Sequence, residues 1–444
     1  MISLGCPRTL VDSELYLGRL AQHGFKVVDG VEGSDTVIIN TCSFLEASIK
    51  ESIDTILQAV ELKKQGKIKS VVVAGCLVQR FKQGLIKDLP EVDGFVGVDG
   101  FGDIETVVQR ALEGRQPTSL RAHPQVPHRG NRVARSALTP AHYAYLKISE
   151  GCLKGCSFCV IPKIKGPLSS RPIEAVVDEA AQLVEERGVQ ELIVVGQDTS
   201  DYGVDLYGHP RIAELLRALG GVRGVRWIRL LYCHPRGISD ELVETLRDVP
   251  AVCPYLDSAI EHADDAVLER MNRRTTQAHM RERIARLRRE VPGITLRTSV
   301  IVGFPGETEA AFETLLAFLR EIRFERLGAF TYSREESSAS FGYPDQVPEA
   351  IKQERFDRLM SLQQAIATEV NAGMVGRTMP VMIDERDANE PGQYLGRTNA
   401  DCPEVDGLVF VRSPVPLAPG TLVPVRIVDS LEYDLVGEVT ASPG

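Results

Sequence analysis

The chain has 444 residues, of which 43% are hydrophobic and 25% charged, and its formal net charge is −10. This length allows two or three domains, and the composition is that of an ordinary globular protein. The acidic balance argues against a general nucleic-acid binder, and no apolar run reaches the roughly 20 residues that span a bilayer.

No signal peptide is visible at the start of the chain. The nine cysteines are an odd number and lack the density of a disulfide scaffold. An odd number of cysteines at low density is typical of a protein in a reducing compartment and of metal-binding thiols. We therefore expect a cytoplasmic protein without membrane contact.

Residues 1–116 alternate short apolar strands with helical stretches. Residues 36–40 and 70–74 are buried-strand runs rich in Val and Ile, and residues 46–64 between them carry apolar side chains at helical spacing. This βαβ pattern predicts a doubly wound parallel sheet. The strand before Cys6 is short, so we expect either a clipped strand or a chain that begins further upstream.

Residues 117–140 read as a linker. They contain four prolines and no acidic residue, and they also contain Arg121, Arg129, Arg132 and Arg135. Proline-rich segments without apolar periodicity separate domains more often than they form elements.

Residues 141–370 repeat a strand–helix unit six times. Amphipathic helices at residues 173–187 and 308–322 follow two of the strands, and a closing helix is predicted over residues 349–370. The predicted strands are residues 145–149, 191–195, 225–231, 254–259, 295–302 and 326–332. Six units predict an open, partial TIM-like barrel, in which sites lie at the carboxyl ends of the strands.

Residues 371–444 predict a small all-β barrel, with short strands at 378–383, 407–411 and 422–428. From Asn371 onward there are five arginines, no lysine and eleven acidic residues, a balance of about −6. Phosphate binding needs Lys and Arg, so this region suits a basic protein better than RNA. The alternative is that the charges only keep a small barrel soluble.

Three cysteines lie within eight residues: Cys152, Cys156 and Cys159. Such a triad cannot complete a four-coordinate zinc site without a distant fourth ligand, whereas iron–sulfur clusters favour thiolates. The alternative is three buried or zinc-bound cysteines.

A second set, Cys6, Cys42 and Cys76, is dispersed in the sequence, but each follows a predicted parallel strand. Ligands of open parallel sheets bind at the carboxyl ends of strands, so these thiols could meet at one point. The choice between a second cluster and three unrelated buried thiols stays open on this evidence.

Three further features lie at predicted strand ends. Gly303 and Gly306 belong to the turn at residues 298–307, where glycines would let backbone amides approach a ligand. The alternative is a plain strand-to-helix turn. Gln197 is a candidate polar group of the site, and His262 is a weaker candidate because a lone histidine is usually structural. Cys233, Cys253 and Cys402 read as ordinary packed thiols.

The spacing Cys-x-x-x-Cys-x-x-Cys, with Phe158 before the last cysteine, resembles the radical S-adenosylmethionine superfamily. The resemblance implies a [4Fe–4S] cluster whose open iron chelates S-adenosylmethionine and cleaves it to a deoxyadenosyl radical. It also implies that Phe158 lies near the adenine, and that Gln197, Gly303 and Gly306 contact the cofactor.

The segments Ser-Leu-Gly-Cys-Pro at residues 3–7, Asn-Thr-Cys at 40–42 and Ala-Gly-Cys at 74–76 resemble the methylthiotransferase family. This resemblance implies a second [4Fe–4S] cluster on Cys6, Cys42 and Cys76 and a TRAM-like C-terminal barrel. Local features at residues 197–203, 255–257 and 401–407 resemble its RimO-type branch, which modifies an aspartate of ribosomal protein S-twelve.

The resemblance implies methylthio insertion at the β-carbon of an aspartyl residue, with an electron donor and a sulfur donor as further partners and without strong nucleic-acid binding. The alternative is methylthiolation of an adenosine in transfer RNA, and a third is a cluster-bearing electron carrier. We expect Asp401, Glu404 and Asp406 to dock the basic substrate protein. Glu261 departs from the family pattern, because a carboxylate pointing inward would disfavour an anionic substrate.

Overall fold

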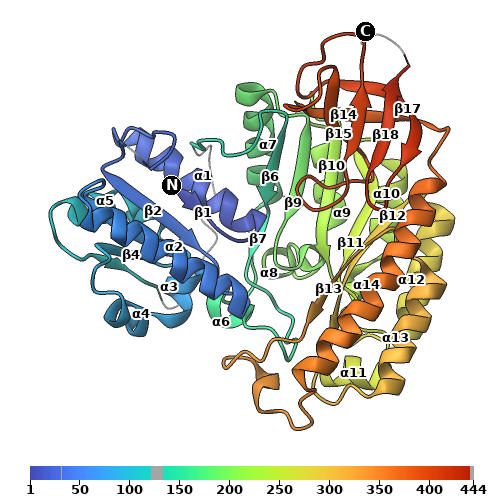
Figure 1. Ribbon diagram of the computed structural model, residues 1–444, viewed down its shortest axis with the longest axis horizontal. Coiled ribbons are helices and arrows are strands. Elements are labelled where there is room, and N and C mark those ends of the chain that lie inside the picture. Colours follow the sequence, from blue (N-terminus) through green and yellow to red (C-terminus); the bar gives the residue numbers. More distant parts are fainter. Residues whose placement is uncertain (32, 122–133, 441–444) are drawn as a thin grey trace.

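The computed structural model describes residues 1–31, 33–121 and 134–440 (Figure 1). Arg129 and Arg132 of the predicted linker lie outside the described residues. Arg135 at its end is buried and pairs with Glu14 of the N-terminal region and Glu179 of the central region. This part of the linker is therefore held between the two regions by charge pairs.

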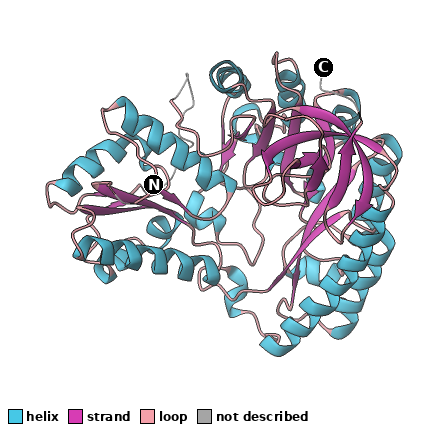
Figure 2. Ribbon diagram, turned by 45° about the horizontal axis from the view of Figure 1, so that its top comes forward, coloured by secondary structure: helices cyan, strands magenta, loops and turns pink. Residues whose placement is uncertain are grey.

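The N-terminal region is a five-stranded parallel sheet in sequence order, covered by helices on both faces (Figure 2). Its strands are β1 (Ile2–Ser3), β2 (Thr36–Thr41), β3 (Ser70–Gly75), β4 (Gly94–Val96) and β5 (Thr118–Ser119). Its helices are α1 (Pro7–Gln22), α2 (Glu46–Lys64), α3 (Cys76–Phe81), α4 (Gln83–Asp88) and α5 (Ile104–Leu112), with a 3-10 turn at Gly100–Asp103. Helix α2 packs on one face, and α1 and α5 pack on the other. The predicted doubly wound sheet is confirmed.

The central region is an open six-stranded parallel sheet in the order β13-β12-β11-β10-β9-β6. Its strands are β6 (Tyr143–Lys147), β9 (Glu191–Val195), β10 (Trp227–Cys233), β11 (Val252–Ser258), β12 (Thr295–Val302) and β13 (Arg326–Thr331). A small separate ribbon pairs β7 (Ser149–Glu150) with β8 (Ser169–Ser170). The predicted six-unit partial barrel is confirmed, with strand ends within two residues of the predicted ones.

Helices cover the outer face of this sheet. They are α7 (Ile173–Arg187), α9 (Ile212–Gly220), α10 (Asp240–Asp248), α12 (Gln277–Glu290), α13 (Glu309–Ile322) and the closing α14 (Glu349–Ala372). Short helices fill the loops: α6 (Ile161–Lys165), α8 (Val204–Tyr207) and α11 (Asp265–Arg270), with 3-10 turns at Thr199–Asp201, Pro235–Gly237 and Ala339–Gly342. Ser239, Thr276 and Thr308 cap α10, α12 and α13, because each hydroxyl accepts a hydrogen bond from a first-turn amide.

The C-terminal region is a closed five-stranded barrel in the order β14-β15-β16-β18-β17. Its strands are β14 (Thr378–Arg386), β15 (Gln393–Thr398), β16 (Val409–Arg412), β17 (Leu422–Ser430) and β18 (Leu435–Val439). The sequence analysis missed β15 and β18, whose patterns are interrupted by Gly396 and Gly437. Both glycines are needed for close packing, since a β-carbon on Gly396 would lie 2.6 Å from the Met382 carbonyl oxygen.

The barrel covers the amino end of the central sheet (Figure 1). Asp401 pairs with Arg326 at 2.6 Å, and Asp406 accepts a hydrogen bond from the Tyr255 hydroxyl at 2.7 Å and lies 3.4 Å from Arg297. The prediction that Asp401 and Asp406 dock a partner is wrong, because both carboxylates are buried against the chain's own arginines. Glu404, the third residue predicted to dock the partner, is exposed.

Among the described helices, none combines the length and the apolar character needed to cross a bilayer.

Candidate functional site

The dispersed cysteines are brought to one edge of the N-terminal sheet. Ser3 lies opposite Asn40 in the register of β1 and β2, and Asn40 lies opposite Ala74 in β2 and β3. Cys6, Cys42 and Cys76 follow these positions by two or three residues. The three thiols therefore leave neighbouring strands at the same carboxyl edge. We call these three residues the N-terminal triad.

Gly5 makes the close approach within this triad possible. Its φ is +91°, and a β-carbon there would lie 2.7 Å from the Cys42 β-carbon and 3.0 Å from its Sγ. Only glycine combines this left-handed backbone with the absence of a side chain at low cost. The Gly-Cys pair at residues 5–6 is therefore a steric requirement of the triad.

The thiols of the N-terminal triad differ in acidity. Burial raises the pKa of Cys76 to about 12, Lys165 lowers it, and the neighbouring Cys42 and Cys6 raise it. Burial also raises the pKa of Cys6, but the Arg8 guanidinium and hydrogen bonds from Thr9 and Arg8 bring it down to about 7. Thiolate is the ligating form, so Cys6 is the thiol of this pair that is poised to ligate at neutral pH.

Cys152, Cys156 and Cys159 form a second group, the central triad, in the loop between β7 and α6. Each sulfur accepts a hydrogen bond: Cys152 from the Lys154 amide at 3.3 Å, Cys159 from the Ile161 amide at 3.4 Å, and Cys156 from Arg273 Nη1 at 3.2 Å. Burial raises the pKa of Cys152 to about 11 and of Cys159 to about 12. The donors around the sulfurs favour thiolates and so suit an electron-rich cluster.

Within the described part of the chain, no three His, Cys, Asp or Glu side chains converge tightly enough for a single metal ion. A cubane makes a different demand, because each thiolate binds its own iron and the sulfurs stand further apart.

The two triads are linked through α6. Val160 and Ile164, which follow Cys159, pack with Val98 against Cys76. The segment that leaves the central triad thus touches the N-terminal triad.

A buried charge quartet lies at the same seam between the two regions. Lys147 pairs with Asp12 of α1 and, at 2.9 Å, with Glu150, while Lys165 lies 3.3 Å from Glu150 and 3.6 Å from Asp12. All four side chains are less than 10% exposed. A buried ion pair persists when its charges are matched and hydrogen-bonded, and here two cations balance two carboxylates. A further buried pair, Arg80 of α3 with Glu335 at 2.7 Å, spans the same two regions.

Two of the predicted cofactor residues lie close to this seam and to the central triad loop. Gln197 follows β9, and its Nε2 donates a hydrogen bond to Glu150. The Oε1 atom of Gln197 is buried without a hydrogen-bond partner. Phe158 packs edge-to-face on Phe304, with ring centroids 6.5 Å apart. Phe304 belongs to the glycine turn, so the structure brings Phe158 and that turn together.

The glycine turn is held by contacts within the chain. The Gly303 amide donates to Glu307 Oε2 at 2.7 Å, and the Gly306 amide donates to the Asp345 carbonyl oxygen at 2.9 Å. The space that a β-carbon would need is taken by Lys352 at Gly303 and by Arg270 at Gly306. Both amides thus have partners within the chain, and the contact of Gly303 and Gly306 with the cofactor stays a prediction.

Several polar atoms at the strand ends of the central sheet are buried without a hydrogen-bond partner. They include Ser149 Oγ, Gln197 Oε1, Ser258 Oγ, His262 Nε2 and Arg273 Nε. Buried polar groups in proteins are nearly always satisfied. An orphan set around the carboxyl edge therefore fits a ligand rich in polar groups, such as S-adenosylmethionine.

His262 is buried, and its Nε2 lies 3.6 Å from Glu307 Oε2 without a hydrogen-bond partner. Its Nδ1 accepts a hydrogen bond from the Asp264 amide at 3.0 Å, and burial lowers its pKa to about 3. Glu261 beside it has a left-handed φ of +67°. Burial raises the pKa of Glu261, and the Arg273 guanidinium lowers it. Glu261 is partly buried.

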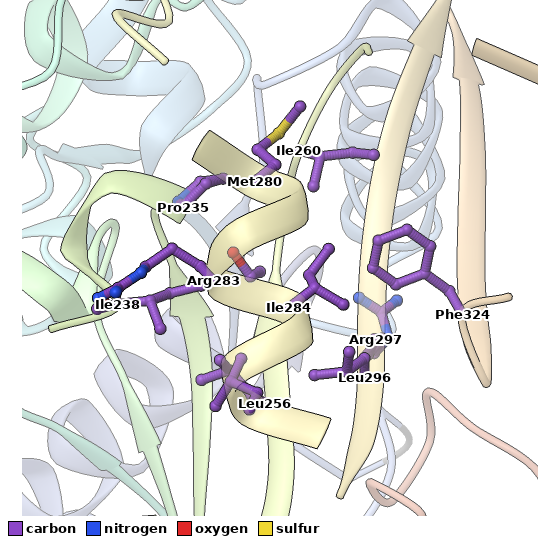
Figure 3. Close-up of a pocket in the computed structure, with 12 residues that line it drawn as sticks. Pro235, Ile238, Leu256, Ile260, Met280, Arg283, Ile284, Leu296, Arg297 and Phe324 are labelled. Carbon is purple, nitrogen blue, oxygen red and sulfur yellow. The ribbon is translucent and has the colours of Figure 1, made fainter. Parts of the chain in front are cut away.

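Two cavities lie in the central region. A cavity of about 20 Å³ lies under α12 and is lined mostly by apolar side chains, among them Leu256, Met280 and Ile284 (Figure 3). It is a packing gap that is too small for a cofactor. A larger groove of about 520 Å³ runs along the outside of the central triad loop at Gly155 and Ser157.

The sequence analysis missed two arginines. Arg8 donates to Cys6 Sγ at 3.4 Å, and Arg273 donates to Cys156 Sγ at 3.2 Å, so each triad has its own guanidinium. A signal was available for Arg8, which follows Cys6-Pro7 in the first turn of α1. Cys233, Cys253 and Cys402 are buried, as predicted for packed thiols.

The domains match known families. Residues 146–319 match the Radical SAM superfamily, residues 1–97 match Uncharacterized protein family UPF0004, and residues 375–440 match the TRAM domain. The Radical SAM match implies a [4Fe–4S] cluster and S-adenosylmethionine for this chain.

Among solved structures, the radical S-adenosylmethionine methyltransferase TsrM from Kitasatospora setae, with cobalamin and a [4Fe–4S] cluster bound, is similar at a TM-score of 0.55 and 16% identity. The likeness covers 89% of this chain and 78% of that chain, and it supports the fold alone.

Curated relatives resemble the chain along its length. The ribosomal protein uS12 methylthiotransferase RimO of Lachnoclostridium phytofermentans is 44% identical, with 98% of each chain covered. The RimO protein of Geobacter sulfurreducens is 43% identical, with 99% of this chain and 98% of the relative covered. With this identity along the whole chain, the protein belongs to the RimO family of radical S-adenosylmethionine methylthiotransferases.

Proposed function

We propose that the protein replaces a hydrogen on the β-carbon of an aspartyl residue of ribosomal protein S-twelve with a methylthio group. The observation that carries the proposal is the contact between the two triad loops, where Val160 and Ile164 pack against Cys76. A sulfur held at the N-terminal triad and a substrate carbon activated at the central triad have to come close for such a transfer.

In this proposal, Cys152, Cys156 and Cys159 hold a [4Fe–4S] cluster, and Cys6, Cys42 and Cys76 hold a second. Each cluster keeps an iron without a protein thiolate. When bound at the central triad, cluster and S-adenosylmethionine supply the radical chemistry that removes the substrate hydrogen. The protein orients the groups and excludes water, and external donors provide electrons and sulfur.

Two features of the barrel favour a protein substrate over RNA: its acidity and its lack of lysine. The lack of lysine is the stronger of the two. Its described surface carries six exposed acidic side chains and four exposed arginines. The net charge of these exposed side chains is therefore much less negative than the net charge counted from the sequence. Residues 371–444 contain no lysine. RNA affinity depends on neutralising phosphates with lysine and arginine, and the four exposed arginines are a small footprint for that purpose.

Two assays run in parallel test the substrate class. Reconstituted enzyme is incubated with S-adenosylmethionine, reductant and sulfide, together with either ribosomal protein S-twelve or transfer RNA. We expect mass spectrometry to show the methylthio mass gain on an aspartyl residue of the protein and none on the RNA. Methylthiolation of transfer RNA without modification of S-twelve would refute the proposal.

Glu404 remains our candidate for docking the basic substrate protein, because its side chain is exposed. Opposite charges steer encounter, and salt screens them. Glu404→Lys should slow association with S-twelve at low salt and flatten the salt dependence of the association rate. A matched reversal at exposed Glu113, in the N-terminal region, should leave both unchanged. Equal effects of the two variants would exclude a specific role for Glu404.

A further inference from the structure

Arg8 lies where the N-terminal triad meets the carboxyl edge of the central sheet. Its Nε donates to Cys6 Sγ at 3.4 Å, and its Nη1 donates to the Gly196 carbonyl oxygen, just after β9, at 2.8 Å. Its guanidinium carbon lies 4.8 Å from the centroid of the Tyr232 ring, near the end of β10. One side chain thus touches a thiol of one region and two strand ends of the other.

Among the described residues, Arg8 differs from most cations at the seam in having no carboxylate within ion-pair distance. Lys147 and Lys165 share Asp12 and Glu150, and Lys154 lies 2.8 Å from Asp201. A guanidinium has five N–H donors, and Arg8 uses two of them in the described contacts. The remaining donors on Nη1 and Nη2 form a free fork, the geometry that matches a carboxylate.

Arg273, the other guanidinium beside a triad, also uses two of its five N–H donors. It donates from Nη1 to Cys156 and from Nη2 to the Ala259 carbonyl oxygen, and its Nε is buried. Arg273 is only 5% exposed and lies beside the central triad, whereas Arg8 is partly exposed beside the N-terminal triad, so Arg8 is the one that a substrate carboxylate can reach there.

Tyr232 fixes the position of Arg8. It has a left-handed φ of +60°, although it is not glycine, and its amide donates to Asp257 Oδ2 at 3.0 Å. Such backbone strain persists only where surrounding contacts enforce it, and it concentrates at functional sites. The strained residue presents its ring to the guanidinium, which adds a cation–π contact.

We propose that Arg8 receives the side-chain carboxylate of the aspartyl substrate and so selects an anionic substrate for this site. The inference rests on the proposed function and goes beyond it by naming the residue that reads the substrate. An ion pair at Arg8 would hold the carboxylate beside the N-terminal triad, with the adjacent β-carbon near the seam between the triads. An adenine ring has no negative charge to offer this fork.

The test compares two substrates: ribosomal protein S-twelve, and the same protein with its modified aspartyl residue changed to asparagine. Binding of both to the cluster-loaded enzyme is measured without reductant, so that no turnover occurs. A charge-assisted hydrogen bond is worth about 1.5–3 kcal/mol, which is roughly a 10- to 100-fold preference for the aspartyl form. Arg8→Gln should abolish this preference, and it should raise KM for S-twelve more than it lowers kcat.

Two further variants make the outcome decisive. Arg8→Lys keeps the charge but lacks the planar fork, so it should keep a reduced preference for the aspartyl form. This variant still tests the proposal if Arg8→Gln loses iron. Arg19→Gln removes another arginine of α1 that stacks on an aromatic ring, and it should keep the full preference. Iron content and the electron paramagnetic resonance spectrum report whether each variant retains its clusters.

An undiminished preference for the aspartyl form in Arg8→Gln would overturn the proposal and reduce Arg8 to a neighbour of the cluster. Equal binding of the two substrate forms by the wild-type enzyme would also overturn it. Failure of the proposed function is separate, because it shows as methylthiolation of transfer RNA by the wild-type enzyme.

Discussion

Arg397 of the barrel donates a hydrogen bond of 2.8 Å to Glu191, the first residue of β9. Arg229 of β10 donates to the other oxygen of the same carboxylate at 2.9 Å, and all three side chains are at most 1% exposed. The barrel is thus attached to the central sheet by a buried carboxylate shared between two guanidiniums. Arg397 also pairs with Asp384 at 2.7 Å, so removing Arg397 leaves one carboxylate of this network without a compensating guanidinium.

Arg397→Met should therefore lower the free energy of unfolding by about 3–5 kcal/mol, the usual cost of breaking a buried ion pair from one side. Denaturant unfolding of the metal-free protein measures the change. Arg412→Met is the matched control, because Arg412 is exposed on β16 of the same barrel. Its effect should stay within about 0.5 kcal/mol, and equal losses in the two variants would refute the shared-carboxylate explanation.

The two triads should bind iron independently. Replacing Cys152, Cys156 and Cys159 with alanine should leave about half of the iron and abolish deoxyadenosine formation, because the N-terminal triad has its own set of thiolates. Iron analysis and chromatography of the reaction products provide the two readouts. Complete loss of iron from a variant that remains folded would contradict this independence.

The Gly5→Ala variant should lose the iron that is bound at the N-terminal triad. The new β-carbon would lie 2.7 Å from that of Cys42, so the thiol has to move. Gly24→Ala is the matched control, because Gly24 has a similar φ of +84° but nothing within 4 Å of a β-carbon. Both variants carry the same backbone strain, and only Gly5→Ala should lose iron. A similar loss in both would mean that backbone strain, rather than contact with Cys42, is responsible.

The contact of Arg135 with Glu179 should make stability depend on pH. Burial raises the pKa of Glu179, but Arg171 and Arg135 bring it down to about 2, below its ordinary value of 4.5. A carboxylate with a lowered pKa contributes stability that is fully present above its unfolded pKa and is lost as the pH falls towards the folded one. This shift corresponds to about 3 kcal/mol.

Glu179→Gln should therefore be less stable than the wild-type chain at pH 6, and the gap should narrow as the pH falls below 4.5. Unfolding of the metal-free protein across this pH range measures the gap. Glu186→Gln on the same helix, at an exposed position, should show no such trend. A gap that stays constant between pH 6 and pH 3 would contradict the role of the ionised carboxylate.

Much of the fold was predictable because buried parallel strands are encoded locally. The run of three valines in β3 predicts a strand, and Cys76 directly after it lies at a carboxyl edge wherever the sheet is placed. The central triad was predictable for the same reason, since its three cysteines are close in sequence. By contrast, β15 and β18 are short and are interrupted by glycine, so their alternation of buried and exposed residues is recognisable only in the closed barrel.

The error at Asp401 and Asp406 has a different cause. Their partners Arg326 and Arg297 lie 75 and 109 residues earlier in the chain, and composition alone cannot tell a carboxylate paired across domains from one facing solvent. Arg8 was missed for a similar reason, because its contacts with Gly196 and Tyr232 exist only after two domains have packed together.

The quartet of Asp12, Lys147, Glu150 and Lys165 has a consequence for motion during turnover. Hinged separation of the two halves would break the contacts of Asp12 with Lys147 and Lys165, while Glu150 would stay paired with both lysines. The Arg80–Glu335 pair adds to this resistance from another point of the seam. Three buried ion pairs across the seam therefore oppose separation of the triads, so the groups expected to move during the reaction are the substrate side chain and the small sulfur group.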